Sequence, residues 1–530
     1  MGSLWKKETN RADAQLVDLF ANIGQKSSVQ EWDRQIKSSN WKHRFLMTAV
    51  DAGKNNSISD NFRANGNMYF KQKLWVEAME FYSQSLYFAE TGTNNVSFAY
   101  ANRATCFLNM KEYEKCLKDI DLAVEAKYPE HLMSKLMKRK ADCVNLMKKN
   151  PAVAAFDPKL SLKASEPFPC MADALEIQRN DEFGRHLVAK CDIDVGQTIL
   201  VEENFASIAS GYDRVNCFEC IQTKMNFMPC TECSDALFCS ADCRDRSEIH
   251  KVSCGATIHR MPNNVRYIAR SILVALKSFT NANDMMDFVA NILSERATKI
   301  PAAANDVRSK YALFLSLQPA SPGVLDIETV YKVFKGLLEV PSVKAMFESK
   351  QSQRFLMHLI GEHFLIISNN SYGGSLSSAS SIGTTALVMS LFNHACAPNV
   401  FNSSMGNKEV CITMRPIKKG QQLFVKYLCG DRTTRQRQDM LLNQWGFLCK
   451  CDKCVPHCSP GDRSKMKSDP CFKALVKSAS INFYDITNFS QLTNKCVQFL
   501  KKYGHLPWSE EMDVVLKAYT KCLLDPFPDM

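Results

Sequence analysis

Apolar and polar residues recur with two different periods along this chain of 530 residues. Helical spacing predicts helices over residues 265–277, 330–338, 353–367 and 435–445, and over most of 470–524. Two-residue alternation predicts strands: a hairpin over 185–201 that turns at 194–196, and short strands over 410–414 and 422–428 around a turn at 418–420. A Ser/Gly-rich stretch at 372–385 breaks the helical pattern. This succession predicts an α+β protein with several domains.

A repeat with an offset of 38 residues occupies residues 62–149. Its matching positions are Gly66, Trp75, Ala78 and Tyr82 in the first copy and Ala104, Tyr113, Cys116 and Ile120 in the second. A tetratricopeptide unit has about 34 residues and places small residues where its two helices approach closely. The four extra residues fit a longer loop at 91–95, and residues 132–147 fit a third or capping helix. Tandem tetratricopeptide-like hairpins are predicted, with an unrelated amphipathic bundle as the alternative.

Composition narrows the classes of protein. With 45% hydrophobic residues the chain can bury several cores, which excludes a disordered polymer. The 22 cysteines, without a secretory signal, favour a reducing compartment and metal ligation over disulfides. Apolar runs are too short to span a bilayer, and the net charge of +11 is spread in short pieces, which favours a solvated basic surface. A protein of the cytoplasm and nucleus is expected, without membrane insertion or direct nucleic-acid binding.

A cluster of seven cysteines and one histidine lies within 38 residues. It consists of Cys217-x2-Cys220, Cys230-x2-Cys233, Cys239-x3-Cys243 and His250-x3-Cys254. Such gaps let a tight turn or one helical turn present two ligands to one ion, and zinc prefers four thiol or imidazole ligands in tetrahedral geometry. The cluster therefore predicts two zinc sites. Because four protein ligands leave no open position for water, both zinc ions are expected to be structural.

A second constellation lies nearer the C-terminus. The segment Asn393-His394-Ala395-Cys396-Ala397-Pro398-Asn399 is followed by Cys449, Cys451 and Cys454. This trio lacks one ligand for a tetrahedral zinc ion. Cys396 is the preferred fourth ligand, because it would clamp the C-terminal segment over the Asn-His loop. His457 or Cys458 is the alternative, since closing a short loop costs less entropy.

The order of these motifs over residues 175–455 resembles the SET and MYND domain-containing family, in the branch known as member four. The resemblance implies that Cys217, Cys220, Cys239 and Cys243 hold one zinc ion and that Cys230, Cys233, His250 and Cys254 hold the other. It further implies a β-rich SET domain that is split by a MYND finger and a helical insert. The implied division is an N-terminal helical segment (1–61), tetratricopeptide-like repeats (62–149), linker (150–170), first SET part (171–216), MYND finger (217–254), helical insert (255–380), SET core (381–430), post-SET segment (431–458) and C-terminal helices (459–530).

SET enzymes transfer a methyl group from S-adenosylmethionine to a lysine amine. The resemblance implies that S-adenosylmethionine is bound by Phe183, Gly184, Arg185, Asn370, Asn393, His394, Tyr427 and Phe447, and that Tyr427 also orients the amine. Three zinc ions, a protein substrate with a target lysine, and protein partners at the MYND and tetratricopeptide-like regions are implied as well. The alternatives are an ordinary strand aromatic for Tyr427, a turn residue for Asn370, and a purely architectural MYND finger.

Four positions depart from the family pattern. His186 stands where a second glycine is usual, Ala395 replaces a serine, Gln421 replaces an acidic residue, and Trp445 replaces a channel tyrosine, which removes a hydroxyl but keeps an aromatic wall. These departures support a rival hypothesis, a non-catalytic adaptor in transcriptional or chaperone complexes. A third hypothesis, a nucleic-acid binder, finds no recognition helix or stacking motif in the sequence.

Overall fold

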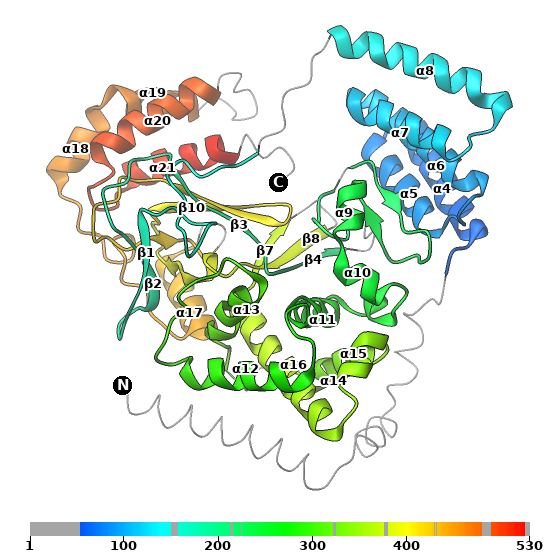
Figure 1. Cartoon of the computed structure of the whole chain (residues 1–530). Coiled ribbons are helices and arrows are strands. Elements are labelled where there is room, and N and C mark those ends of the chain that lie inside the picture. The colour runs from blue at the N-terminus through cyan, green and yellow to red at the C-terminus, as the bar shows by residue number, and fades with distance from the viewer. Residues whose placement is uncertain are drawn as a thin grey trace.

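The computed structural model describes residues 53–149, 157–211, 216–223, 225–321, 325–375, 380–428, 430, 432–479 and 489–524. A helical block comes first, and strands follow that are interrupted by a cysteine-rich segment and a second set of helices (Figure 1). More strands and a C-terminal helical block complete the chain. Within these ranges we find no helix whose length and apolar character would suffice to cross a bilayer.

The N-terminal block is a pair of helical hairpins with one further helix. Its elements are α4 (Asn56–Lys71), α5 (Trp75–Phe88), α6 (Asn94–Asn109), α7 (Tyr113–Glu125) and α8 (Glu130–Lys149). Helices α6 and α7 begin 38 residues after α4 and α5, so the structural period equals the sequence offset. A Cβ atom on Gly66 would lie 2.6 Å from the Tyr82 ring, so glycine is what lets α4 and α5 pack this closely. The prediction of an N-terminal helical region is confirmed.

The cysteine-rich segment packs directly against these hairpins. It contains β5 (Met228–Pro229), β6 (Leu237–Phe238), α9 (Ala241–Asp245), α10 (Glu248–Ser253) and the 3-10 turn η1 (Thr257–Arg260). A single apolar cluster includes Phe107 from α6 and Phe227 and Phe238 from this segment. Because their core is shared, the hairpins and the cysteine-rich segment form one folding unit.

Small sheets assembled from distant parts of the chain form the centre of the molecule. The strands are β1 (Leu175–Asn180), β2 (Gly184–Ala189), β3 (Thr198–Glu203), β4 (Ala206–Gly211), β7 (Tyr372–Ser375), β8 (Ser380–Thr385), β9 (Asn393–His394), β10 (Val400–Met405), β11 (Lys408–Thr413) and β12 (Phe424–Val425). Strand β1 pairs with β2, β3 with β11 and β4 with β8, all antiparallel, whereas β9 and β12 are parallel. Strands that precede the cysteine-rich segment therefore pair with strands that follow the second set of helices.

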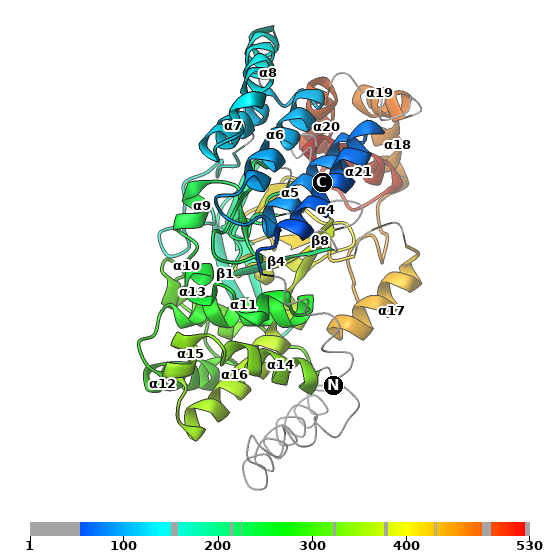
Figure 2. The same cartoon turned by 90° about the vertical axis from the view of Figure 1, so that its right-hand side faces the viewer.

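Two sets of helices flank the sheets in Figures 1 and 2. The first contains α11 (Asn263–Leu276), α12 (Ala282–Glu295), α13 (Val307–Ser316), α14 (Ile327–Leu337), α15 (Pro341–Met346) and α16 (Lys350–Asn370), and shares one apolar core with the strands. The second contains α17 (Thr434–Trp445), α18 (Pro460–Ser468), α19 (Pro470–Ala479), α20 (Phe489–Tyr503) and α21 (Glu510–Leu524). Helices α18–α21 have a core of their own, which also includes Val195 and Met414.

The strand pairing differs from the prediction in two places. The predicted hairpin over 185–201 does not form, because the backbone N–H groups of Ile193 and Gly196 donate to the carbonyls of Ile417 and Thr413 instead of closing a turn. Strand β2 pairs with the preceding β1. The Ser/Gly-rich stretch contains β7 and β8, where the absence of a side chain at Gly383 leaves room for the Tyr267 ring. Both differences arise from long-range pairing that local patterns do not reveal.

The segment predicted as a linker at 150–170 is part of the core over its described residues. The Ser161 N–H donates to the Thr198 carbonyl at 2.9 Å, and Phe168 is buried. The strand predicted over 422–428 shortens to β12. Residues 1–52 of the predicted N-terminal segment and residues 150–156 lie outside the described ranges. The predicted helices over 265–277, 330–338, 353–367 and 435–445 correspond to α11, α14, α16 and α17.

Candidate active site and metal centres

Three groups of four side chains are arranged so that all ligand atoms of a group lie within 4.8 Å of one another. The groups are Cys217, Cys220, Cys239 and Cys243; Cys230, Cys233, His250 and Cys254; and Cys396, Cys449, Cys451 and Cys454. The first two groups take alternate pairs along the chain, which is the interleaving that the family resemblance implied. The third group takes Cys396 as its fourth thiol, whereas His457 is exposed and its Nδ1 lies 3.1 Å from the Val455 carbonyl.

The sulfur spacing fits a tetrahedral zinc site. With Zn–S bonds of about 2.3 Å, neighbouring sulfurs should lie about 3.8 Å apart. The Sγ atoms are 3.5 Å apart for Cys220 and Cys239 and 3.8 Å apart for Cys230 and Cys254. In the third group, Cys454 and Cys396 are 3.5 Å apart. Each group can therefore hold one zinc ion, and four protein ligands per ion indicate structural sites.

The thiols of the first two groups are prepared for metal binding by their neighbours. Hydrogen bonds from Cys220 and Cys239 hold the pKa of Cys217 far below its ordinary value. A hydrogen bond from Cys233 lowers the pKa of Cys230 in the same way. Since the thiolate is the form that binds metal, each group contains a competent ligand at neutral pH.

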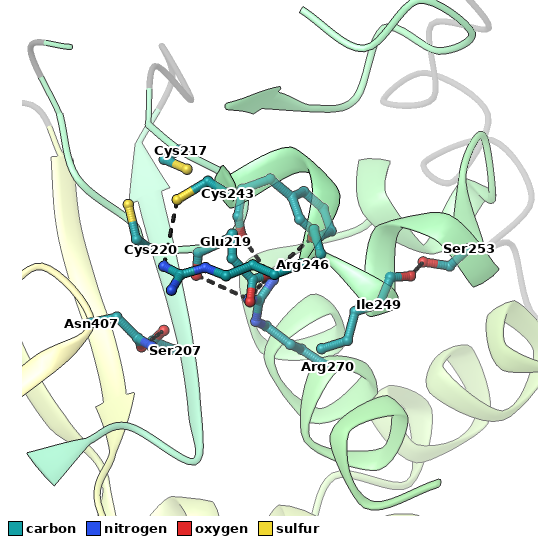
Figure 3. A network of polar contacts seen from close by, with 12 residues as sticks. Ser207, Cys217, Glu219, Cys220, Cys243, Arg246, Ile249, Ser253, Arg270 and Asn407 are labelled. Carbon is teal, nitrogen blue, oxygen red and sulfur yellow. Dashed lines mark hydrogen bonds and ion pairs between the residues drawn. The ribbon is translucent and has the colours of Figure 1, made fainter. Parts of the chain in front are cut away.

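Charged side chains surround the first group (Figure 3). Arg246 Nη2 donates to Cys243 Sγ at 3.5 Å, which places a cation beside the thiolates. Glu219 Oε2 accepts from Ser247 Oγ at 2.8 Å, and the Glu219 carbonyl accepts from Arg270 Nη2 at 3.3 Å. Because Arg270 belongs to α11, this hydrogen bond fastens the cysteine-rich segment to the helices that cover the sheets.

The third group is supported by Arg437 on α17. Its Nε donates to Cys396 Sγ at 3.1 Å, and its Nη2 donates to Cys454 Sγ at 3.6 Å. The guanidinium thus offsets the negative charge that four thiolates bring to a dication. Sequence reasoning missed this residue, since α17 contains both Arg435 and Arg437 and the sequence does not show which of them contacts the thiols.

His394 joins the third metal group to the tyrosine strand. Its Nδ1 accepts the backbone N–H of Tyr427 at 3.0 Å. The proton of the neutral ring is therefore on Nε2, which lies 3.3 Å from Cys396 Sγ and donates to it. Burial lowers the pKa of His394 to about 4 and keeps the ring neutral. Both ring nitrogens are thus used within the protein, and contact with a bound molecule is left to the backbone and the ring face.

Tyr427 stands in an aromatic cluster just after β12. Its hydroxyl donates to the Phe392 carbonyl at 2.7 Å, and burial raises its pKa above the ordinary value. The ring centroid of Trp445 is 5.1 Å from that of Tyr427, and Phe447 is 6.2 Å from His394. These aromatic rings therefore lie close to one another, and their role in a binding site stays a prediction.

The loop between β1 and β2 reaches the Asn-His segment. Asn393 Nδ2 donates to the Phe183 carbonyl at 3.1 Å, although the two residues are 210 positions apart. Gly184 has a φ of +62°, which disfavours a side chain, and an added Cβ would meet no atom within 4 Å. The Gly184 carbonyl lies 3.0 Å from the Nδ1 atom of His186, whose ring is buried. Arg185 is directed toward α13, where it donates to Ser316 Oγ at 3.0 Å.

Asn370 occupies a different setting from the other candidates. It is the last residue of α16, and its Nδ2 donates to the carbonyls of Gln318 and Ile366, both at 2.8 Å. Both amide hydrogens are committed to the backbone, so only Oδ1 could meet a bound molecule. Asn370 is therefore an anchor at the end of a helix and not a turn residue.

Two further residues hold the site together and were not predicted. Asn399 accepts the Phe424 N–H at 2.7 Å and donates to the Gln422 carbonyl at 2.9 Å, which fixes β12 beside the Asn-His segment. The buried carboxylate of Glu202 on β3 accepts backbone N–H groups from Leu387, Val388 and Met389 at 2.8–2.9 Å. An acidic residue inside an apolar strand was the available signal for Glu202.

Comparison with known proteins agrees with this assembly. A SET domain family model matches residues 184–428. The protein-lysine N-methyltransferase SMYD4 of Danio rerio is 24% identical over 503 residues, which cover 77% of this chain and 66% of that protein. SMYD4 of Homo sapiens is 24% identical over 544 residues, covering 76% of this chain and 67% of that protein. Over about three quarters of its length the chain is thus similar to SET and MYND domain-containing proteins. It spans about two thirds of the length of these SMYD4 relatives.

Further similarities cover shorter parts of the chain. A SET and MYND domain-containing protein of Dictyostelium discoideum is 22% identical over 333 residues, covering 53% of this chain and 82% of that protein. The crystal structure of the SET domain of LSMT bound to lysine and AdoHcy matches 57% of this chain and 55% of that chain at 12% identity. Its TM-score of 0.26 is too low to bear on the fold. The residues matched by the SET model enclose the first two metal groups, which therefore interrupt the matched region.

Proposed function

We propose that this chain is an S-adenosylmethionine-dependent protein-lysine N-methyltransferase. The observation that carries the proposal is the meeting of three distant segments: the Phe183 loop, the Asn393-His394 strand and Tyr427. The names of the SMYD4 relatives give the same activity for those proteins. The methyl group would be supplied by bound S-adenosylmethionine, whose sulfonium activates it for transfer.

The residues present fit that cofactor. Gly184 offers open backbone with no atom within 4 Å of a hypothetical Cβ, so an adenosyl group can approach the strand closely. Exposed apolar side chains at Phe183 and Leu448 (39% and 57% exposed) are suited to covering an aromatic base. Phe183, Gly184, Arg185, Asn393, His394 and Phe447 would hold the cofactor, with Asn370 contributing at most its Oδ1.

Tyr427 would position the lysine amine. Its hydroxyl hydrogen is committed to the Phe392 carbonyl, so the phenolic oxygen remains an acceptor for an N–H of the substrate. The raised pKa of Tyr427 keeps the phenol neutral. Trp445 provides an aromatic wall against the lysine side chain and excludes water, which disfavours the charged ammonium form. Alignment and desolvation, rather than an acid or base, would account for catalysis.

A non-catalytic adaptor is the second candidate, and the His186 ring favours it. This ring is buried against the Gly184 carbonyl, one of the backbone groups expected to face the cofactor. In the adaptor hypothesis the SET portion is a scaffold, and the helical hairpins and the finger carry the function.

Calorimetric titration of the zinc-loaded chain with S-adenosylmethionine separates the two candidates. If the chain is an enzyme, S-adenosylmethionine should bind. If it does not bind, the adaptor hypothesis remains. In Tyr427→Phe, we expect S-adenosylmethionine affinity to persist while methyl transfer to protein lysines is lost, because the ring stays but the phenolic oxygen that would meet the amine is removed, together with its hydrogen bond to the Phe392 carbonyl. Unchanged turnover would refute the role of Tyr427.

We further propose that residues 217–254 form a MYND finger and that α4–α8 form tetratricopeptide-like repeats, and that both bind proteins. The interleaved ligand pairs and the 38-residue helical period support this assignment. We also propose that the protein resides in both cytoplasm and nucleus. Imaging of the tagged chain tests this. Pull-down with a chain lacking α4–α8 would not be informative, because those helices share a core with the finger.

A further inference from the structure

The second metal group differs from the other two in the exposure of one ligand. Of the twelve ligand side chains in the three groups, Cys254 alone is exposed, whereas its partners Cys230, Cys233 and His250 are buried. Cys254 is the C-cap residue of α10, and Gly255 follows with a φ of +73° and no atom within 4 Å of a hypothetical Cβ. A small molecule from solvent can therefore reach the sulfur of Cys254.

Sulfurs of the other two groups accept hydrogen bonds from cations. Arg246 donates to Cys243 in the first group (Figure 3), and Arg437 donates to Cys396 in the third. A neighbouring cation stabilises a thiolate and thereby makes its sulfur a weaker nucleophile. Cys254 instead ends a helix, where unpaired carbonyl groups give a thiolate no such stabilisation. Exposure and setting together make Cys254 the ligand most open to chemical attack.

A second sulfur lies within reach of Cys254. The Sγ atoms of Cys230 and Cys254 are 3.8 Å apart. Because a disulfide bond is about 2.05 Å long, the two sulfurs need to approach each other by less than about 2 Å. Cys254 can supply this movement, since it stands between the end of a short helix and an exposed glycine. An oxidised Cys254 can therefore be captured by Cys230.

We propose that Cys254 is a site of oxidation by hydrogen peroxide, and that the disulfide it then forms with Cys230 releases the second zinc ion. The Cys254 thiolate attacks one peroxide oxygen, the O–O bond breaks, and a sulfenic acid and a hydroxide result. The Cys230 thiolate then attacks the Cys254 sulfur and displaces a second hydroxide. The two sulfurs supply the two electrons that reduce the peroxide, and two protons from solvent convert both hydroxides to water. Cys233 and His250 remain, and two ligands are too few for a structural zinc site.

The second group stands where two apolar cores meet, so release of its ion has a structural consequence. Ile249 of α10 belongs to the core that the sheets share with α11–α16, whereas Cys230 and Phe238 belong to the core of the hairpins and the cysteine-rich segment. The His250 ring lies 5.1 Å from the Phe218 ring and 5.3 Å from the Phe238 ring. Oxidation should therefore loosen α10 from β6 and weaken the connection between the two cores. This inference concerns a metal site and does not depend on methyl transfer.

The test is treatment of the full-length, zinc-loaded chain with hydrogen peroxide in the presence of a chromogenic zinc chelator. One of the three ions should be released at least about tenfold faster than the other two, because one ligand alone is exposed. Mass-spectrometric mapping without reductant should find the Cys230–Cys254 disulfide over the same period. Dithiothreitol and added zinc should restore three ions per chain, since a disulfide is reversible.

Cys254→His removes the exposed sulfur but keeps a ligand, because two histidines separated by three residues have a spacing that suits zinc. This variant should retain three zinc ions by elemental analysis and lose the fast release. Cys191→Ser is the matched control, since Cys191 is also exposed and belongs to none of the three groups. It should release zinc within about twofold of the wild-type rate. The wild-type disulfide map tests the proposal whether or not Cys254→His folds.

Three results would overturn the proposal. The first is equal release rates in Cys254→His and wild type, and the second is a disulfide map in which Cys254 stays reduced after the first ion has left. The third comes from amide exchange, which should accelerate in α10 on peroxide treatment while α17, beside the third group, keeps its rate. Equal acceleration in α10 and α17 would mean that peroxide unfolds the chain instead of acting at Cys254.

Discussion

The buried ion pair of Arg103 and Asp119 should stabilise the contact between the helical hairpins and the cysteine-rich segment. Both side chains are fully buried, and two hydrogen bonds of 2.7 and 2.8 Å join them. Arg103 Nη2 also donates to the Phe227 carbonyl at 2.9 Å, while Asn226 Nδ2 donates to Asp119 at 2.7 Å. The pair therefore fastens α6 and α7 to the loop before β5.

Asp119→Ala removes the counter-charge and leaves the guanidinium buried without compensation. Breaking one side of a buried ion pair costs about 3–5 kcal/mol. Asn226→Ala leaves the ion pair intact. It removes one bond to a charged group, which costs about 1.5–3 kcal/mol, and one bond to the Lys115 carbonyl at 2.7 Å, which costs about 0.5–1.5 kcal/mol. Native-state amide exchange of α6 and α7 reports this difference locally, since each 1.4 kcal/mol is about a tenfold change in rate.

We expect amide exchange in Asp119→Ala to accelerate by about two to three orders of magnitude, and clearly more than in Asn226→Ala. The double variant Arg103→Met with Asp119→Leu should recover part of the loss, because apolar replacements remove both charges together. If Asp119→Ala exchanges no faster than Asn226→Ala, or if the double variant is worse than the single one, the ion pair does not carry the interface.

Three further predictions concern the SET portion. Cys396→Ser should reduce bound zinc from three ions to two by elemental analysis, whereas Cys458→Ser should keep three, because the third thiol group contains Cys396. Asn399→Ala leaves two backbone groups of the β12 region unpaired, which should cost about 1–3 kcal/mol and weaken S-adenosylmethionine binding. Burial raises the pKa of Glu409 from 4.5 to about 7, so the folded protein holds this proton more tightly than the unfolded chain. The free energy of unfolding should therefore fall by about 3 kcal/mol as pH rises from about 4.5 through 7. Glu409→Gln should remove this pH dependence from melting curves.

Each of these three predictions can be refuted by a specific result. Loss of an ion in Cys458→Ser, with three ions retained in Cys396→Ser, would assign the fourth ligand locally. Wild-type S-adenosylmethionine affinity in Asn399→Ala would separate β12 from the cofactor site. A pH dependence that is the same in wild type and Glu409→Gln would show that another group titrates.

Sequence patterns predicted those features of the fold that depend on residues close together in the chain. The eight ligands between Cys217 and Cys254, the 38-residue helical period and helices such as α11 and α16 are encoded within short windows of sequence. The interleaved pairing of those ligands came from the family resemblance. The pairing of β2 with β1 rather than β3 could not be predicted in this way. It depends on Ile193 and Gly196 finding Ile417 and Thr413 across the fold, and such long-range contacts leave no periodicity in the sequence.

The candidate site shows the same division. Asn393, His394 and Tyr427 were found through motif order, and the structure places them together. The hydrogen bond that turns His394 toward Cys396 was not predictable, because it depends on which ring nitrogen the Tyr427 N–H meets. Arg437 was missed because its role follows from the position of α17 beside the thiols and not from its own helix.

The place of the cysteine-rich segment inside the SET domain sets an order of events during synthesis. Chains emerge from the ribosome N-terminus first, so the hairpins α4–α7 and both finger ligand groups are complete once Cys254 has emerged. Strands β3 and β4 have emerged by then as well, but their partners β11 and β8 come much later. A nascent chain paused in this interval would already bind two zinc ions while it presents two unpaired strand edges, which are templates for aggregation. Because of this domain order, the cell's folding machinery must protect those edges until β8 and β11 have been synthesised.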